Sequence, residues 1–296
     1  MEFRILGPLE VAGDDGRPID LGRPKQRAVL GLLLLHAGRV VSLEHLIDEL
    51  WGEEPPAQAI ASLQAYVSHL RRVLATPRVL ISQAPGYRLA VGPDDLDAAR
   101  FETLAAQGRR LLEVDEPARA DETLARALAL WRGDVLADLP EIARGERARL
   151  EELRLGALED RIAAGLALGR HAAAVAELDR LVANHPYRES LHGLRMLALY
   201  RSGRQAEALR GYRETRDLLG DELGIDPSPE LELLHQRILG HAPELDRPVK
   251  ARTKVKLRLR IKMTMITPMF FKYCGMCGRV KRTETARTAQ NIPAAL

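Results

Sequence analysis

The chain has 296 residues, of which 46% are hydrophobic and 29% charged, and its net charge is +3. This length and composition predict a globular protein with room for two domains, each with a buried core. No apolar run is long enough to cross a membrane, and the first residues lack the basic and apolar segments of a signal peptide. We therefore expect a cytoplasmic protein that makes no membrane contact.

The positive charge is confined to the C-terminal end of the chain. Residues 248–296 hold twelve Lys and Arg and a single acid, Glu284, whereas residues 1–247 hold 32 basic and 40 acidic residues. The net charge of the whole chain is therefore no evidence for nucleic-acid binding. Six of the seven lysines and both cysteines also lie in this basic tail, which we expect to be disordered. The residues leave open whether the tail is native or appended sequence.

The order of elements in residues 1–93 is strands, three helices and a hairpin, and it predicts a helix-turn-helix domain of the α+β class. The alternation that marks the first strands is carried by Phe3, Ile5, Leu9 and Val11. The limits of the first two helices are set by Pro24, Gly38, Ser42 and Gly52. A third helix spans residues 57–74, and a hairpin follows with its turn at Pro85-Gly86.

The third helix has one apolar face and one small, acid-free face. Its apolar stripe is formed by Leu63, Val67, Leu70 and Leu74, which fall within about 60° of one another. A solvated face usually carries long Glu and Lys pairs, whereas short polar side chains allow a helix to enter the major groove of DNA. The residues that we expect to contact DNA on this helix are Ser62, Gln64, Ala65, Ser68, His69, Arg71 and Arg72. Gln64 and His69 are expected at base edges, Ala65 at a thymine methyl group, and the two arginines at phosphates or guanine.

Other candidate DNA contacts lie outside this helix. Arg23, Lys25 and Arg27 gather at the start of the first helix, where free N–H groups also favour phosphate. Tyr87 and Arg88 lie in the hairpin, from which Arg88 is expected to enter a minor groove. Against DNA binding stands the balance of ten basic and ten acidic residues in the first 93, which predicts modest affinity per subunit.

From Asp94 to residue 243 the apolar periodicity is helical throughout, so the chain as a whole is predicted to be mostly α. The expected helices cover 96–113, 117–132, 141–168, 170–184, 187–202, 204–219 and 229–240. Gly169-Arg170 recurs as Gly203-Arg204, an offset of 34 residues, which is the period of stacked tetratricopeptide helix pairs. A generic helical bundle with coincidental spacing is the alternative.

No arrangement of residues points to catalysis, a metal or a cofactor. The chain contains neither a phosphate-binding GxxxxGK[ST] loop nor a GxSxG elbow, and its eight histidines are scattered. Cys274 and Cys277 have the spacing of half a zinc knuckle but lack a second ligand pair. We expect a protein that is not an enzyme and binds neither metal nor cofactor.

Segments in both halves of the chain carry a family resemblance. In residues 1–93 they are RILGPLEV, GRPKQRAVLGLLLLHAGRVVS, LIDELWGEEPP, LQAYVSHLRRVL and APGYRLAV. In the helical part they include FETLAAQGRRLL, ALALWRGDVLADLP and HPYRESLHGLRMLALYRSGRQAEALRGYRETRDLLGDELGIDPSPEL. Over residues 2–240 the chain resembles the Streptomyces antibiotic regulatory proteins, which are pathway-specific transcription activators of secondary-metabolite gene clusters.

The resemblance implies an OmpR-like winged helix in residues 1–93 and a bacterial transcriptional activation domain in residues 94–243. Within the first, Ala57–Leu74 would be the recognition helix and Ile81–Leu89 the wing. Such proteins bind direct repeats of promoter DNA near the −35 element as a side-by-side pair and recruit RNA polymerase holoenzyme. The loop from Gly52 to Pro56 would face the polymerase, with Glu53 and Glu54 suited to a basic surface on the sigma factor. The chain shows no phospho-accepting receiver domain of a two-component phosphorelay.

Two other functions remain open from the residues. In one, the chain is a tetratricopeptide-type adapter for protein interactions whose winged helix has lost DNA binding. In the other, it is a regulator gated by a small molecule held in the helical domain.

Overall fold

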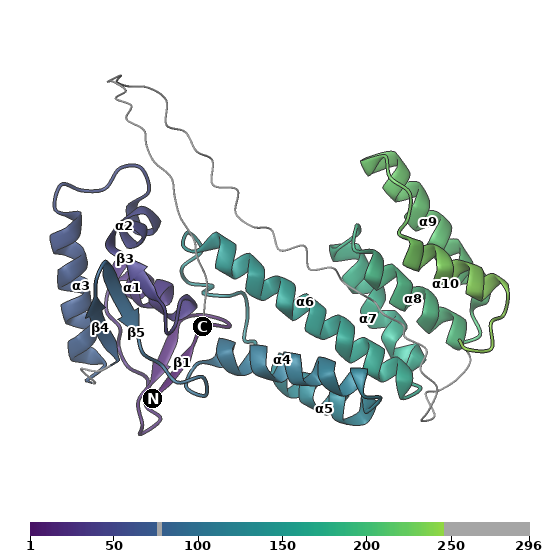
Figure 1. Cartoon of the computed structure of the whole chain (residues 1–296), viewed down its shortest axis with the longest axis horizontal. Coiled ribbons are helices and arrows are strands. Elements are labelled where there is room, and N and C mark those ends of the chain that lie inside the picture. Colours follow the sequence, from purple (N-terminus) through teal and green to yellow (C-terminus); the bar gives the residue numbers. More distant parts are fainter. Residues whose placement is uncertain (76–78, 246–296) are drawn as a thin grey trace, which may run out of the picture. The chain divides into compact units, whose positions relative to one another are not determined.

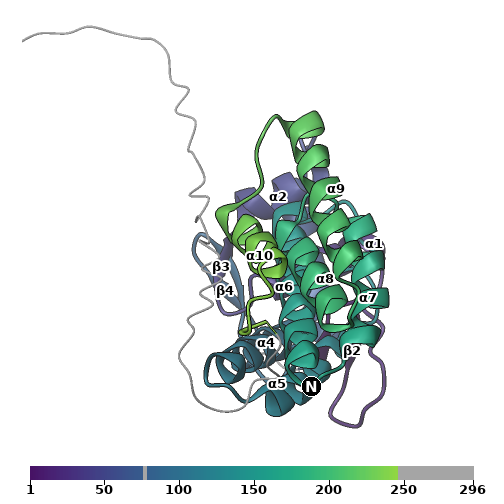
Figure 2. The same cartoon turned by 90° about the vertical axis from the view of Figure 1, so that its right-hand side faces the viewer.

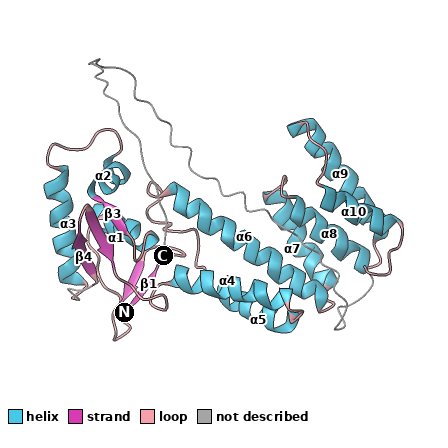
Figure 3. Cartoon of the chain, in the orientation of Figure 1, coloured by secondary structure: helices cyan, strands magenta, loops and turns pink. Residues whose placement is uncertain are grey.

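The computed structural model describes residues 1–75 and 79–245, and the basic tail with Cys274 and Cys277 lies outside this part. Strands occur only in the N-terminal portion of the described residues, and helices make up the rest (Figure 1, Figure 3). This confirms the predicted mostly α fold class. No helix in the described ranges is long and apolar enough to cross a membrane.

The N-terminal portion combines two small antiparallel sheets with three helices. Its elements are β1 (Glu2–Arg4), β2 (Glu10–Ala12), α1 (Pro24–Leu35), β3 (Val40–Ser42), α2 (Leu43–Trp51), α3 (Ala59–Val73), β4 (Leu80–Gln83) and β5 (Gly86–Leu89). Strand β1 pairs with β2, and the second sheet has the order β3-β5-β4. The three helices and the hairpin agree with the predicted winged helix, whereas β3 was not expected.

Local signals begin and end the first helices as predicted. Pro24 occupies the first turn of α1, and the Ser42 hydroxyl accepts a hydrogen bond from the His45 backbone nitrogen at 3.1 Å at the start of α2. Helix α2 ends at Gly52, whose φ of +64° is a left-handed conformation that favours glycine. In α1 every residue from 28 to 35 is buried, so this helix packs on all sides.

The helical module consists of seven helices. They are α4 (Asp97–Glu113), α5 (Pro117–Leu128), α6 (Arg144–Ala167), α7 (His171–Asn184), α8 (Glu189–Arg201), α9 (Gln205–Leu223) and α10 (Pro229–Leu239). Helices α7, α8 and α9 lie side by side (Figure 2). Helix α5 ends earlier than predicted and α9 continues four residues further, but each expected helix is present.

The repeat of 34 residues has the same structure in both copies. Gly169 and Gly203 end α6 and α8 with φ of +83° and +75°. One residue further on, the nitrogen of Arg170 donates to the Gly165 carbonyl, and the nitrogen of Arg204 donates to the Leu199 carbonyl, both at 2.9 Å. This six-residue closure is the Schellman end of a helix. The recurring dipeptide therefore marks two equivalent turns between paired helices.

Two hydrophobic clusters form the core of the part of the chain that the structure describes. One extends along the chain from Phe3 to Ala164, and the other extends from Leu155 to Leu245. The first includes Val135, Leu136, Leu139 and Ile142 together with the buried residues of α1 and α3. The winged helix therefore shares a continuous core with α4, α5, α6 and the segment between α5 and α6.

Candidate nucleic-acid interface

Helix α3 exposes the face that the sequence assigns to DNA. Gln64, Ala65, Ser68 and Arg72 are exposed, and Ser62 is half-buried. The opposite side is in the core, where Leu63, Val67 and Leu70 are at most 1% exposed. Since the exposed side chains are short except for Gln64 and Arg72, a groove wall or a base edge can approach the helix closely.

Arg71 joins α3 to the wing instead of pointing away from the protein. Its Nε donates to the Leu80 carbonyl at 3.0 Å, and its Nη2 donates to the Ser82 hydroxyl at 2.8 Å. Its guanidinium also lies 6.0 Å from the centre of the buried Tyr87 ring. Arg71 therefore fixes the position of β4 relative to α3, a role that sequence reasoning missed.

His69 is directed toward the segment that precedes α1. Its Nδ1 accepts a hydrogen bond from Arg72 Nη2 at 3.1 Å. Its Nε2 is buried and would lie 2.7 Å from a Cβ placed on Gly22, whose φ is +84°. Gly22 therefore provides both the backbone conformation and the space that the ring occupies.

The three cations at the start of α1 are placed differently from one another. Arg23 is exposed. The Lys25 ammonium donates to the Leu50 carbonyl and lies 5.6 Å from the Trp51 ring, so it closes the end of α2. Arg27 forms an ion pair with Asp138, which lies between α5 and α6. Of these cations, Arg23 is therefore the best placed for a DNA phosphate.

The wing is a tight hairpin with an exposed tip. Strand β5 pairs with both β3 and β4, and Arg88 lies opposite Val40 on one side and Ile81 on the other. Arg88 is half-buried, and its Nε donates to Gln83 Oε1 at 3.0 Å. Gln83 is exposed at the tip, and it is a candidate contact that the sequence analysis did not single out.

In the loop between α2 and α3 every residue from Gly52 to Gln58 is exposed, including both Glu53 and Glu54. Trp51 and Tyr66 stack at its base, with ring centroids 6.4 Å apart and planes 24° apart. The two carboxylates thus extend from a supported loop next to the first turn of α3.

The comparisons with known proteins agree with this geometry. The profile described as "Transcriptional regulatory protein, C terminal" matches residues 16–89, and the bacterial transcriptional activator domain matches residues 96–239. The regulatory protein DnrI of Streptomyces peucetius is 42% identical over 259 residues, which cover 83% of this chain and 95% of DnrI. The chain belongs to the Streptomyces antibiotic regulatory protein family. This confirms the resemblance found in the sequence, and the family consists of transcriptional regulators rather than enzymes.

Other family members extend beyond the region shared with this chain. The regulatory protein AfsR of Streptomyces coelicolor is 49% identical over 247 residues, but the chain spans only 25% of its length. A solved structure of Mycobacterium tuberculosis EmbR in complex with a low affinity phosphopeptide is 40% identical, with a TM-score of 0.77. The match covers 81% of this chain and 65% of the EmbR chain. The winged helix and helical module are therefore a shared unit within larger regulators.

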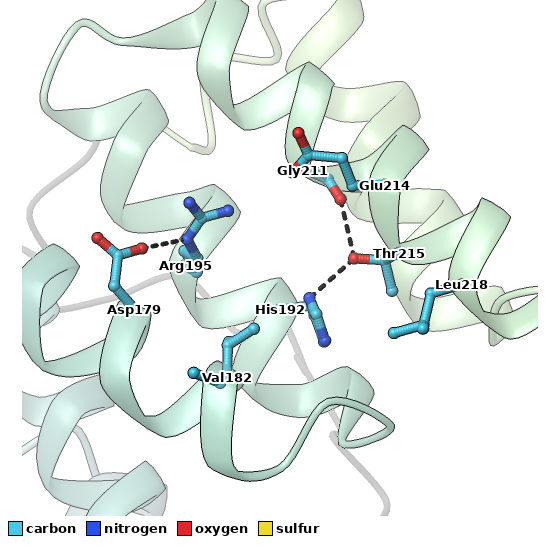
Figure 4. Close-up of a pocket in the computed structure, with 9 residues that line it drawn as sticks. Asp179, Val182, His192, Arg195, Gly211, Glu214, Thr215 and Leu218 are labelled. Atoms are coloured by element: carbon cyan, nitrogen blue, oxygen red, sulfur yellow. Dashed lines mark hydrogen bonds and ion pairs between the residues drawn. The ribbon is translucent and has the colours of Figure 1, made fainter.

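A small hollow of about 270 Å³ lies between α7, α8 and α9 (Figure 4). His192, one of the residues that line it, is bonded at both ring nitrogens, to the Thr215 hydroxyl and to the Pro186 carbonyl, each at 2.8 Å. The Thr215 hydroxyl oxygen also lies 2.8 Å from the Gly211 carbonyl oxygen, and Arg195 Nε donates to Asp179 at 2.5 Å. Since these polar groups already have partners within the protein, they do not select a ligand and give no support to gating by a small molecule.

The described residues contain no cluster of three or more His, Cys, Asp or Glu side chains arranged to hold a metal ion.

Proposed function

We propose that this family member is a sequence-specific DNA-binding transcription activator of a secondary-metabolite gene cluster. The observation that carries the proposal is the acid-free, exposed face of α3 opposite a fully buried leucine and valine stripe. A major groove about 12 Å wide accepts an α-helix with such a face.

The proposed contacts follow from the side chains on that face. Gln64 pairs with the N6 and N7 edge of adenine, Ala65 contacts a thymine methyl group, and Arg72 binds guanine or a phosphate. Because Arg71 bonds both Leu80 and Ser82, the wing is held in a fixed position relative to α3. With α3 in a major groove, this connection would direct Arg88 and Gln83 toward the adjacent minor groove.

Pairing on DNA follows from the charge of the winged helix. Residues 1–93 carry equal numbers of basic and acidic side chains, so one subunit gains little from non-specific attraction to phosphates. Two subunits on adjacent direct repeats near a −35 element would combine their affinities. The exposed loop with Glu53 and Glu54 would then face RNA polymerase holoenzyme and meet a basic surface of its sigma factor.

DNA recognition is tested by selecting bound duplexes from a random-sequence library with the full chain, followed by footprinting of the enriched site. We expect a direct repeat to be enriched, and the double variant Gln64→Ala with Arg72→Ala to lose protection of it. Arg110→Ala, an exposed arginine on α4, is the matched control and should bind as the unmodified chain does. If the folded protein enriches no duplex at low salt, the activator function is wrong, and the interaction-adapter alternative gains support.

Polymerase recruitment is tested separately with the double variant Glu53→Lys and Glu54→Lys. We expect this variant to protect the same DNA but to lose transcription from the selected promoter in a purified system. The adjacent exposed acids Asp221 and Glu222 of α9, both changed to Lys, provide a control with the same change in charge. Equal transcription by the two variants would show that the loop does not contact the polymerase.

A further inference from the structure

The segment that connects α5 to α6 is unusual for its length and its burial. Residues 129–143, here called the strap, contain neither helix nor strand. Loops of about this length without secondary structure are uncommon in compact domains and are often functional. Its apolar side chains belong to the core, with Val135 and Leu136 at 0% exposure and Ile142 at 5%. The strap therefore runs along the surface through exposed residues such as Arg132 and Asp138, but it sends apolar side chains into the packed interior.

Backbone N–H groups of the strap donate hydrogen bonds to carbonyl groups of the chain just after β1. The nitrogen of Arg132 donates to the Leu6 carbonyl at 2.7 Å, and the nitrogen of Leu136 donates to the Ile5 carbonyl at 3.0 Å. Buried backbone groups need such partners, and here they come from a segment about 130 positions away in the sequence. The strap thus takes the place of a strand neighbour at the edge of the winged helix.

Two carboxylates join the strap to the helices that precede α3. Asp138 accepts hydrogen bonds from the Leu9 nitrogen at 2.7 Å and from Arg27 of α1, whose Nε is 3.1 Å away. At the other end of the strap, the Ala143 nitrogen donates to Glu49 Oε2 of α2 at 2.7 Å. Both α1 and α2 are therefore bonded to the same segment of the helical module.

Side-chain packing continues these bonds toward α3. The terminal methyl carbons of Leu136 and Ile142 would lie 3.2 and 3.4 Å from a Cβ placed on Gly31 of α1. Helix α1 in turn packs against α3, and it has no solvated face between residues 28 and 35. A contiguous path of contacts thus connects the strap to the proposed recognition helix through α1.

The strap holds backbone strain at two of its contacts with the winged helix. Leu136 has φ of +48° and Ala143 has φ of +49°, in the left-handed region that side chains with a Cβ rarely adopt. Such conformations persist only where the surrounding contacts impose them, and they occur often at switch regions. Both residues donate their backbone N–H to the winged helix, at Ile5 and Glu49 respectively.

We infer that the strap couples the helical module to the DNA-reading helix, with Asp138 as the positioning residue that holds α1. Partner binding to the helical module then alters DNA affinity through the strap, and DNA binding stabilises the strap in return, because coupling between two sites is reciprocal. Only the DNA half of this inference rests on the proposed function.

The test is amide hydrogen exchange of the full chain with Asp138→Asn, which keeps an acceptor for Leu9 but removes the charge next to Arg27. Asp160→Asn is the matched control, because Asp160 also bonds an arginine, Arg109, and the two carboxylate side chains are 22% and 27% exposed. We expect the amide exchange rates in α1, α2 and α3 to rise about tenfold in Asp138→Asn, because the variant loses one charge-assisted hydrogen bond. Asp160→Asn should leave these helices unchanged. Glu49→Gln tests the α2 contact in the same way.

A second arm of the experiment uses DNA. We expect the duplex selected above to slow exchange of the strap amides, and Asp138→Asn to bind that duplex about tenfold more weakly than Asp160→Asn. Unchanged exchange in α1–α3 of Asp138→Asn, or equal changes in both variants, would overturn the coupling. If no duplex is selected, the proposed function fails, while the exchange of the unbound protein still decides whether the strap positions α1.

Discussion

The carboxylate of Asp97 and the backbone nitrogen of Ile5 lie 2.8 Å apart, so the first residue of α4 holds the chain that follows β1. The same carboxylate accepts from the backbone nitrogens of Leu6 and Ala98. Asp97 is 2% exposed, and its burial raises the pKa of the carboxyl group, an effect that these three N–H donors oppose. The winged helix and the helical module therefore meet at a buried carboxylate.

Replacement of Asp97 by Asn should destabilise the protein. The amide keeps one acceptor but places an NH₂ group against buried N–H donors, and at least one donor is left unsatisfied. We expect the free energy of unfolding, measured by urea denaturation, to fall by about 1–3 kcal/mol. Asp94→Asn, at an exposed neighbouring position, should change it by less than about 0.5 kcal/mol. Equal stabilities of the two variants would show that the hydrogen bonds of Asp97 do not stabilise the contact between the winged helix and the helical module.

Arg71 and Arg72 are adjacent in sequence but should have separable effects. Arg71→Ala removes the bonds to Leu80 and Ser82, so we expect it to lower the free energy of unfolding by about 1–3 kcal/mol as well as DNA affinity. Arg72→Ala should leave stability within about 0.5 kcal/mol. If Arg72 binds a phosphate, its loss should also reduce the slope of log affinity for DNA against log salt concentration by about one. Fluorescence anisotropy at several salt concentrations measures this, and an unchanged slope with unchanged affinity would remove Arg72 from the interface.

Gly86→Ala should disrupt the wing. A Cβ at this position would lie 1.9 Å from the Val41 carbonyl oxygen and 2.8 Å from the Ser42 Cα, both backbone atoms that cannot turn aside. The pairing of β3 with β5 must then open, at a cost of at least about 2 kcal/mol measured by urea denaturation. Gly220→Ala is the control, because nothing lies within 4 Å of its Cβ position in α9. Gly220→Ala should raise the free energy of unfolding by about 0.5–1 kcal/mol, because alanine has the higher helix propensity. If Gly220→Ala instead lowered it as much as Gly86→Ala does, the clash at Gly86 would not be the cause.

His192 should contribute to the loss of stability in mild acid. Burial lowers the pKa of His192, and the positive charge of Arg195 lowers it further, while the Pro186 carbonyl and Glu189 act in the opposite direction. Thr215 of α9 bonds Nδ1, and Asp179 of α7 pairs with Arg195. The folded protein thus favours the neutral ring. Its contribution to stability is complete above the unfolded pKa of about 6.5 and is lost as the pH falls toward the lower folded value.

The measurement is the free energy of unfolding between pH 7.5 and 5.5 for the unmodified chain and for His192→Gln. The unmodified chain should lose more stability over this range, by about 1.4 kcal/mol for each unit by which the folded pKa is lowered. His171 and His235 also have lowered pKa values, but they are present in both proteins and cancel in the comparison. Parallel curves would show that His192 does not titrate in this range.

Much of the fold could be predicted because its signals are local. The buried stripe of α3, the Ser42 cap of α2 and the two glycine turns 34 residues apart each depend on residues within one or two helical turns. Strand β3 was missed for the opposite reason. It is only three residues long, Val40–Ser42, and its extended conformation depends on pairing with β5 more than forty positions later.

The candidate site also has one part that the sequence predicted and another that it did not. The sequence determined which face of α3 is buried and which face is exposed, because helical periodicity decides both, and Gln64, Ala65, Ser68 and Arg72 are exposed as expected. Only the tertiary structure decided which cations remain available to DNA. Lys25, Arg27 and Arg71 have long side chains whose partners, the Leu50 carbonyl, Asp138 and the Leu80 carbonyl, come from other elements. A side chain that spans several ångströms is placed by what packs around it, and that information is spread over the whole chain.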